Sequence, residues 1–205
     1  MSIQINYKNS SLKKSPTNLV LFVEENFNIS SLKKHISNTE FTYINDLLKT
    51  SDLKKNLLVF EVSSKKKIIL VSIKKNLETS DIENLGAEFY GYIKYGKKSE
   101  YFVNADSISS KFKNFISYFL HGLKLKSYEF NIYKSKKDAK LISINVIGNK
   151  NKPTMQNELR FRAIEKGTFF ARDLVSEPPN VLNPKEYVNR LLKLRKLGIK
   201  VTVYN

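Results

Sequence analysis

The chain has 205 residues and a formal net charge of +17, from 36 Lys and Arg against 19 Asp and Glu. It has no Cys, which excludes disulfide bonds and thiolate metal sites. No apolar run approaches the ~20 residues of a membrane helix, and the N-terminal residues lack the apolar core of a signal peptide. These features predict a cytoplasmic protein with no membrane partner. The length suits one complete domain and part of a second.

The positive charge is spread along the whole chain. Residues 1–150 hold 25 Lys, no Arg and 14 acidic residues, and residues 151–205 hold 6 Lys and 5 Arg against 5 acidic residues. Such a balance favours nucleic acid or anionic surfaces as partners. Nucleic-acid surfaces usually also use Arg, which binds phosphates and bases bidentately. With 31 Lys and only 5 Arg, we favour the codon bias of an A+T-rich genome, and DNA binding stays the alternative.

Strand and helix patterns alternate along the first 150 residues. In chain order, the predicted elements are strands at 19–23, 57–62 and 67–73, a helix at 81–95, a strand at 101–103, a helix at 108–124 and a strand at 141–147. We expect Ser80 or Asp81 to cap the helix at 81–95. Gly96 is expected to end that helix, and Gly148 to end the strand at 141–147. This alternation predicts an α/β sandwich.

A second set of elements follows a polar stretch at residues 148–157. Residues 158–175 have helical patterning, and Pro178 and Pro179 are expected to end that helix. Asn183 is suited to the N-cap position of another helix, with Pro184 at its first position. Residues 199–204 alternate between apolar and polar types, which predicts a half-buried strand after Gly198.

Charged side chains near the end of the first of these helices need compensation. Asp173 and Glu177 are four residues apart, so they share a helix face close to its C-terminus. Negative charge is unfavourable at that end of the helix dipole. We expect Arg172 or a neighbouring segment to offset it, and we assign the pair no catalytic role.

Three segments of the chain carry a resemblance to one family. Residues 171–187, ARDLVSEPPNVLNPKEY, closely resemble the signature that opens the catalytic domain of the leucyl aminopeptidases, the metal-dependent M17 peptidases. Residues 84–94 are similar to a weaker pattern of the family that opens a helix. A pattern near the end of the family's N-terminal domain is carried by Gly122, Tyr128, Phe130, Tyr133 and Lys134. Ser176 stands where the family more often has Asn or Thr, and residues 1–80 match no motif.

The resemblance implies a division of the chain into three parts. Residues 1–150 would form the N-terminal macro-like domain, residues 151–177 a linker helix, and residues 178–205 the truncated start of the catalytic peptidase domain. The implied fold is a macro-like three-layer α/β sandwich, with a mixed sheet flanked by helices. The first helix and strand of a second α/β domain would follow the linker.

The resemblance also implies an activity for a longer protein. The family removes N-terminal amino acids from peptides, favouring Leu, with two divalent metal ions, Mn or Zn, and assembles as a hexamer. The implied partners are therefore the chain's own catalytic domain, a homo-oligomer and peptide substrates. The family's metal-binding motifs, a Gly-rich stretch with Lys and Asp and an Asn-Thr-Asp-Ala-Glu-Gly-Arg run, do not occur in these 205 residues. We therefore expect no catalytic, cofactor-binding or metal-binding residue in this chain, which would be inactive alone and serve assembly or regulation.

Other candidate residues point to no chemistry of their own. His35 and His121 are the two histidines, and no carboxylates lie near either at metal-ligand spacing. Gly86, Gly91 and Gly96 do not have the spacing of a phosphate-binding loop. Two alternatives to a peptidase fragment remain open, namely a basic nucleic-acid-binding module and a stand-alone, non-catalytic relative.

Overall fold

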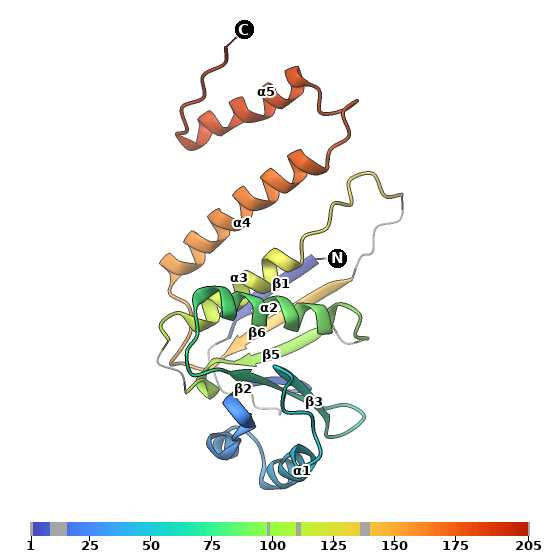
Figure 1. Ribbon diagram of the computed structural model, residues 1–205, viewed down its shortest axis with the longest axis vertical. Coiled ribbons are helices and arrows are strands. Elements are labelled where there is room, and N and C mark those ends of the chain that lie inside the picture. Colours follow the sequence, from blue (N-terminus) through green and yellow to red (C-terminus); the bar gives the residue numbers. More distant parts are fainter. Residues whose placement is uncertain (1, 9–15, 98, 110–111, 136–139, 205) are drawn as a thin grey trace. The chain divides into compact units, whose positions relative to one another are not determined.

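The sheet at the centre of the fold contains six strands. A computed structural model describes residues 2–8, 16–97, 99–109, 112–135 and 140–204 (Figure 1). The strands are β1 (Ser2–Tyr7), β2 (Asn18–Glu24), β3 (Leu57–Glu61), β4 (Lys67–Ile73), β5 (Glu100–Asn104) and β6 (Leu141–Ile147), in the order β1-β6-β5-β2-β4-β3. Only β3 runs antiparallel to its neighbour; the other pairs are parallel. The sheet is therefore mixed, as predicted.

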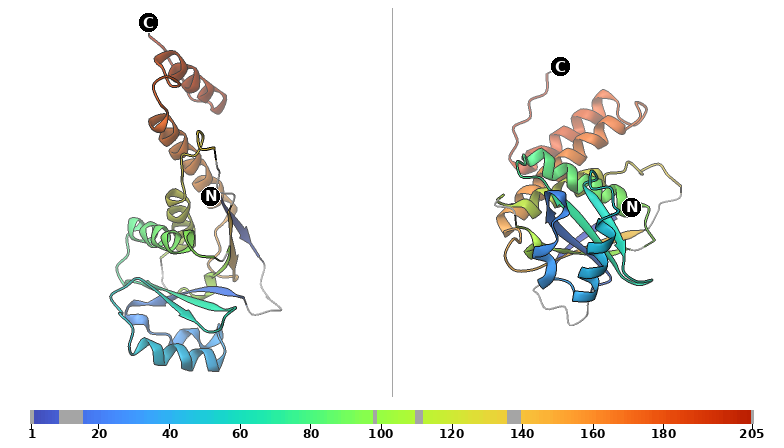
Figure 2. Two further views of the ribbon diagram at one scale, coloured as in Figure 1. Left: turned by 90° about the vertical axis from the view of Figure 1, so that its right-hand side faces the viewer. Right: turned by 60° about the horizontal axis from the view of Figure 1, so that its bottom comes forward.

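Helices cover both faces of this sheet (Figures 1 and 2). Helices α2 (Thr79–Lys94) and α3 (Phe115–Lys126) lie on one face, and α1 (Asn38–Leu48) lies on the other with the 3-10 turns η1 (Glu25–Phe27) and η2 (Ser30–Lys34). Side chains of β2 alternate between the two cores: Val20 and Phe22 pack on the α2–α3 side, whereas Leu21 packs on the α1 side. The three-layer sandwich is confirmed.

The two helices on the first face approach each other unusually closely. A Cβ atom at Gly86 of α2 would lie 1.9 Å from the Phe119 carbonyl oxygen, and one at Gly122 of α3 would lie 1.9 Å from the Glu83 carbonyl oxygen. Only glycine fits at these two positions. Phe119 also meets Phe22 of the sheet edge-on, with ring centroids 5.2 Å apart. These contacts hold α2 and α3 as one layer.

Two predicted helix starts are wrong, for reasons of local geometry. Helix α2 begins at Thr79, because Glu78 is its N-cap and Asp81 is the third helical residue of a capping box. The next helix begins at Phe115 rather than at residue 108, because Asn114 adopts the left-handed conformation (φ 61°), which no right-handed helix continues through.

Two elements in the first 50 residues escaped sequence analysis. Strand β1 pairs with β6, which follows it by more than 130 residues. Helix α1 begins with a capping box in which the Ser37 hydroxyl accepts from the Glu40 N–H at 3.3 Å and Glu40 accepts from the Ser37 N–H at 3.0 Å. That Ser-x-x-Glu box was a usable sequence signal for a helix start.

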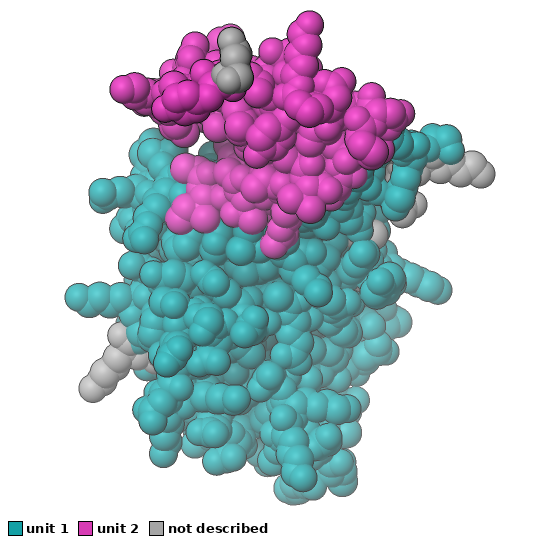
Figure 3. Space-filling view, turned by 45° about the horizontal axis from the view of Figure 1, so that its top comes forward, with its two compact units in different colours: residues 1–162 teal, residues 163–205 magenta. Residues whose placement is uncertain are grey.

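The chain divides into two compact units, residues 1–162 and 163–205 (Figure 3). Helix α4 (Met155–Ser176) contributes residues to both units. Within the first unit, Phe161 of α4 is buried and its ring lies 5.2 Å from that of Tyr118. The assignment of residues 1–150, 151–177 and 178–205 to family domains stays a prediction.

In the second unit, the predicted helices are confirmed and the predicted strand is not. Helix α4 is followed by α5 (Pro184–Leu192) and the 3-10 turn η4 (Lys193–Leu197). Asn183 caps α5 through a hydrogen bond from the Glu186 N–H to its side-chain oxygen, at 3.0 Å. Residues 199–204 form no strand, because within the described residues of this unit no strand offers the backbone partners that a ladder needs.

Candidate binding pockets at the ends of the strands

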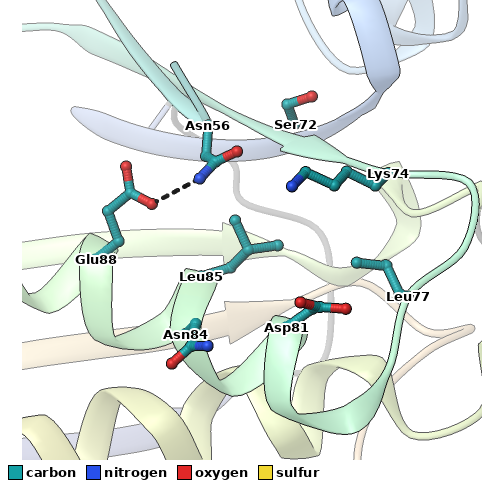
Figure 4. A pocket seen from close by; sticks show the side chains of 8 residues that line it. All are labelled: Asn56, Ser72, Lys74, Leu77, Asp81, Asn84, Leu85 and Glu88. Carbon is teal, nitrogen blue, oxygen red and sulfur yellow. Dashed lines mark hydrogen bonds between the residues drawn. The ribbon is translucent and has the colours of Figure 1, made fainter. Parts of the chain in front are cut away.

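A pocket of about 210 Å³ lies where β4 ends and α2 begins, and we call it the β4 pocket (Figure 4). Its lining residues come from the residue before β3, the end of β4, the connection from β4 to α2, and the first three turns of α2. They are Asn56, Ser72, Lys74, Leu77, Asp81, Asn84, Leu85 and Glu88. The carboxyl ends of parallel strands are where open α/β sheets usually bind ligands.

Hydrogen bonds fix the walls of the β4 pocket. The Asn56 side-chain amide donates to Glu88 Oε2 at 3.0 Å, which joins the start of β3 to α2. The Asn56 carbonyl accepts from the Ser72 N–H at 2.8 Å. Asp81 accepts from the Glu78 N–H at 2.9 Å, which fixes the first turn of α2. The acidic side chains are therefore held in place by the fold before any ligand arrives.

A second pocket, of about 240 Å³, lies past the carboxyl ends of β5 and β6, and we call it the β5 pocket. It is lined by Pro16, Leu19, Lys34, His35, Asn104, Asp106, Ile147 and Gly148. The His35 Nδ1 and the Asn104 side-chain nitrogen are 3.1 Å apart. The Asp106 carboxylate accepts hydrogen bonds from the backbone N–H groups of Asn149, at 2.9 and 3.0 Å, and Lys150, at 2.7 Å. The Asp106 carboxylate thus stabilises the loop after β6.

The environment of His35 favours a neutral imidazole. Burial lowers its pKa below 6.5, and the nearby positive charge of Lys34 lowers it further, while Asp106 opposes both effects. The His35 Nε2 is buried and has no hydrogen-bond partner among the described residues. Asn104 lies beside the other ring nitrogen, Nδ1.

The structure keeps the two histidines apart. His35 follows η2 on the α1 face of the sheet, whereas His121 is buried in α3 on the opposite face, with its ring 4.7 Å from that of Phe161. Among the described residues, no three His, Asp or Glu side chains gather as they would to hold a metal ion. The described residues therefore do not fit the two metal ions that the family resemblance implies, and that no site residue lies in this chain stays a prediction.

Glu177, the second member of the predicted acidic pair, directly follows α4 and is compensated by a neighbouring segment. Glu177, whose side chain is 4% exposed, accepts from Arg190 of α5 at 3.0 Å. Arg190 also donates to Glu186 at 3.1 Å. Arg190 thus joins the end of α4 to α5 inside the second unit.

Sequence analysis considered His35, Asp81 and Gly148 singly and did not predict either pocket. Lys74, Asp81 and Glu88 lie in different turns and elements, and no spacing pattern unites them. One signal was present: Lys74 follows directly after a buried apolar strand, a position at which polar residues often face a ligand. The approach of β3 to α2, which completes the pocket, is a tertiary contact.

Similarity to known proteins is partial in sequence and broad in fold. The chain is 36% identical over 91 residues to a probable cytosol aminopeptidase of Agrobacterium fabrum, covering 42% of this chain and 18% of that protein. It is 28% identical over 151 residues to one of Rhizobium leguminosarum bv. trifolii, covering 70% and 30%. It thus matches less than a third of the length of these curated relatives. No family model matches the chain.

A solved structure of a mutant tomato leucine aminopeptidase has the same fold, with a TM-score of 0.70 at 16% identity, over 96% of this chain and 42% of that one. The fold is therefore that of an α/β protein in which a helix-flanked mixed sheet precedes further helices. Together with the sequence matches, this confirms the resemblance of the chain to the N-terminal domain of the leucyl aminopeptidases (M17). None of its described helices has both the length and the apolar character needed to cross a membrane.

Proposed function

We propose that this chain is the N-terminal portion of a metal-dependent leucyl aminopeptidase of the cytoplasm, and that it serves assembly or regulation rather than catalysis. One observation carries the proposal: sequence identity to cytosol aminopeptidases extends over 151 residues of a chain whose fold matches a leucine aminopeptidase over 96% of its length. The whole protein would remove N-terminal amino acids from peptides.

Catalysis would belong to another part of that protein. The described residues supply no cluster of metal donors, and the family's metal-binding motifs do not occur in the sequence. Two divalent ions, Mn or Zn, would polarise the scissile carbonyl and activate water, but the described residues provide no place for them. We therefore assign this chain no step of hydrolysis.

Apolar side chains in the second unit support a larger protein. Residues of η4 and the segment after it are exposed, including Leu197 at 75% and Tyr204 at 89%. Large apolar residues gathered at a surface usually mark a contact with further structure. In the proposed protein, the peptidase domain would cover them.

A hydrolysis assay tests the non-catalytic role. We expect no release of ammonia from leucine amide by the purified chain with added Mn²⁺. Chelator-sensitive turnover that follows the chain through purification would overturn this assignment.

A measurement of the intact mass of the protein, isolated from its source organism, tests whether this chain is part of a longer aminopeptidase. A mass about twice the 23.7 kDa of this chain, or more, supports an aminopeptidase with its metal-binding half. A native mass of 23.7 kDa would contradict the proposal and favour a stand-alone relative.

One feature favours a second candidate function, a basic nucleic-acid-binding module. The net charge of +17 attracts polyanions irrespective of the fold. This function is compatible with the first, and its salt dependence separates the two.

A further inference from the structure

The β4 pocket holds opposite charges that do not neutralise one another. Lys74 is exposed and makes no ion pair or hydrogen bond with any described residue. Asp81 and Glu88 line the same pocket, and neither lies within salt-bridge distance of Lys74. Figure 4 shows the Lys74 side chain running along the pocket, between the strand side with Asn56 and the helix side with Leu85 and Asp81. A ligand with both charges can complement both.

The acidic groups already hold neutral donors. Glu88 accepts from the Asn56 amide at 3.0 Å, and Asp81 accepts from a backbone N–H at 2.9 Å. Each ionised carboxylate has about four acceptor sites, so both retain capacity for a cationic donor. Hydrogen bonds to a charged partner are about twice as strong as neutral ones. An ammonium group is therefore the natural complement of the helix side.

Apolar side chains line the β4 pocket beside the charged groups. Leu85 is 8% exposed and Leu77 is half-buried, and both line the pocket. The volume of about 210 Å³ is below the roughly 300 Å³ at which drug-sized ligand pockets begin. The ligand is therefore small, with an anionic group, a cationic group and an aliphatic part.

We propose that the β4 pocket binds a free α-amino acid with an aliphatic side chain. Lys74 would bind the carboxylate, Asp81 the ammonium group, and Leu77 and Leu85 the side chain. Binding is inferred from the pocket alone. Its role rests on the proposed function: such amino acids are the products that the aminopeptidase would release, and their return to the N-terminal domain would make the pocket a product sensor.

Calorimetric titration of the purified chain with L-leucine tests the binding. We expect saturable one-site binding, and weaker binding of three analogues, each lacking one group: leucine amide, 4-methylpentanoate and glycine. No saturable binding of L-leucine overturns the proposal. Equal affinity for 4-methylpentanoate also overturns it, because the pocket would then be an anion site only.

Charge-removing variants locate the ligand. Lys74→Gln should weaken L-leucine binding by about tenfold or more, the effect of losing a charged hydrogen bond. Lys75→Gln is the matched control, since Lys75 is the exposed neighbour outside the lining, and it should leave affinity unchanged. Asp81→Asn removes the charge but keeps a side-chain oxygen as acceptor for the Glu78 N–H. Weaker L-leucine binding by this variant would therefore reflect the lost charge rather than a disrupted first turn of α2. Equal weakening by Lys74→Gln and Lys75→Gln would contradict the site.

These measurements need no peptidase activity. If L-leucine does not bind but the native mass includes the peptidase half, the proposed product sensor is wrong and the proposed parent enzyme stands. Binding in a protein whose native mass is that of this chain would reject the parent enzyme and keep the pocket.

Discussion

Gly86 and Gly122 show what the residues behind the family resemblance do in this chain. Both lie in segments that resemble leucyl aminopeptidase patterns, and each faces a backbone carbonyl of the opposite helix at a distance that leaves no room for a Cβ. Their role is packing rather than chemistry. Gly91, on the same helix as Gly86, has nothing within 4 Å of an added Cβ.

Substitution of Gly86 and Gly91 distinguishes the effect of helix–helix packing from the effect of helix propensity. Gly86→Ala should lower the free energy of unfolding by about 1–3 kcal/mol, because the new methyl group overpacks the α2–α3 contact. Gly91→Ala should raise it by up to about 1 kcal/mol, since alanine favours an exposed helix. Urea denaturation of both variants measures the difference. Equal stability of the two would show that the helices do not meet at Gly86.

Glu129 is expected to make the stability of the fold sensitive to acid. Hydrogen bonds from Lys94, at the end of α2, and from Asn131 lower the pKa of Glu129 from 4.5 to about 2. A carboxyl whose pKa is lower in the folded state stabilises the fold above the unfolded pKa. This contribution is therefore present above about pH 4.5 and is lost as the pH falls towards 2.

Glu129→Gln should remove that pH dependence and cost about 1 kcal/mol at neutral pH, the size expected for a partly exposed pair. Glu24→Gln, at an exposed position of β2, is the control and should leave the acid limb of the stability curve unchanged. The check is chemical denaturation from pH 7 to pH 2. An unchanged acid limb in Glu129→Gln would refute the pairing.

At the scale of elements, the residues at the ends of a helix determine where it begins more than the pattern of its interior does. Helix α5 begins where Asn183 and Pro184 predicted, because capping depends on neighbouring residues only. The start of α3 depends on the left-handed conformation of Asn114, whose side-chain oxygen accepts from Asn157 at 2.8 Å. That contact spans 43 residues, so helical periodicity before Phe115 gave the wrong start.

Arg190 controls the connection between α4 and α5. Arg190→Gln should loosen it, because Glu177 would keep a largely buried charge without its cation. We expect faster proteolysis at residues 177–183, with mass spectrometry identifying the cut. Lys193→Gln changes a nearby exposed cation and should leave the rate unchanged. Equal rates for the two variants would show that the bridge has no structural role.

At the scale of the whole molecule, charge and fold argue for different partners. The net charge of +17 comes mostly from Lys, and Lys pairs with phosphate as a point charge without reading bases. The fold, by contrast, matches an aminopeptidase domain over nearly its whole length. The charge therefore predicts affinity for polyanions, whereas a role within an enzyme stays a proposal that depends also on the sequence matches.

Duplex DNA binding should be weak and lost near 150 mM salt, as expected for non-specific phosphate contacts, each contributing about −0.9 to the slope of log affinity against log salt. Fluorescence anisotropy over a salt series measures this slope for two unrelated sequences. Tight binding at physiological salt that distinguishes the sequences would establish the nucleic-acid module instead.

Removal of residues 1–150 from the proposed full-length protein should change its oligomer size more than its affinity for metal ions. The reason is that the described residues hold no metal cluster, whereas the proposed role of this domain is assembly. Light scattering and metal titration of the same preparation provide the two readouts. A loss of metal affinity with unchanged oligomer size would contradict an assembly role.

Local chemistry was enough to predict much of the chain. The apolar runs of β2, β3 and β4, the caps of α5 and the proline break after α4 depend on residues close in sequence, and each was predicted to within a few positions. The α/β class and the resemblance to leucyl aminopeptidases also followed from sequence. Burial preferences, proline geometry and N-capping act over one or two turns, so one segment contains all that they need.

Only the tertiary structure determined which segments meet. The pairing of β1 with β6, the Gly86–Gly122 contact and the joining of Asn56 to Glu88 around the β4 pocket each bring together residues distant in sequence. The strand predicted at residues 199–204 fails for the same reason, because a strand needs a partner and the alternating pattern does not supply one. A sequence encodes the preferences of each segment, but pockets and ladders exist only when separate segments satisfy one another's hydrogen bonds and fill one another's space.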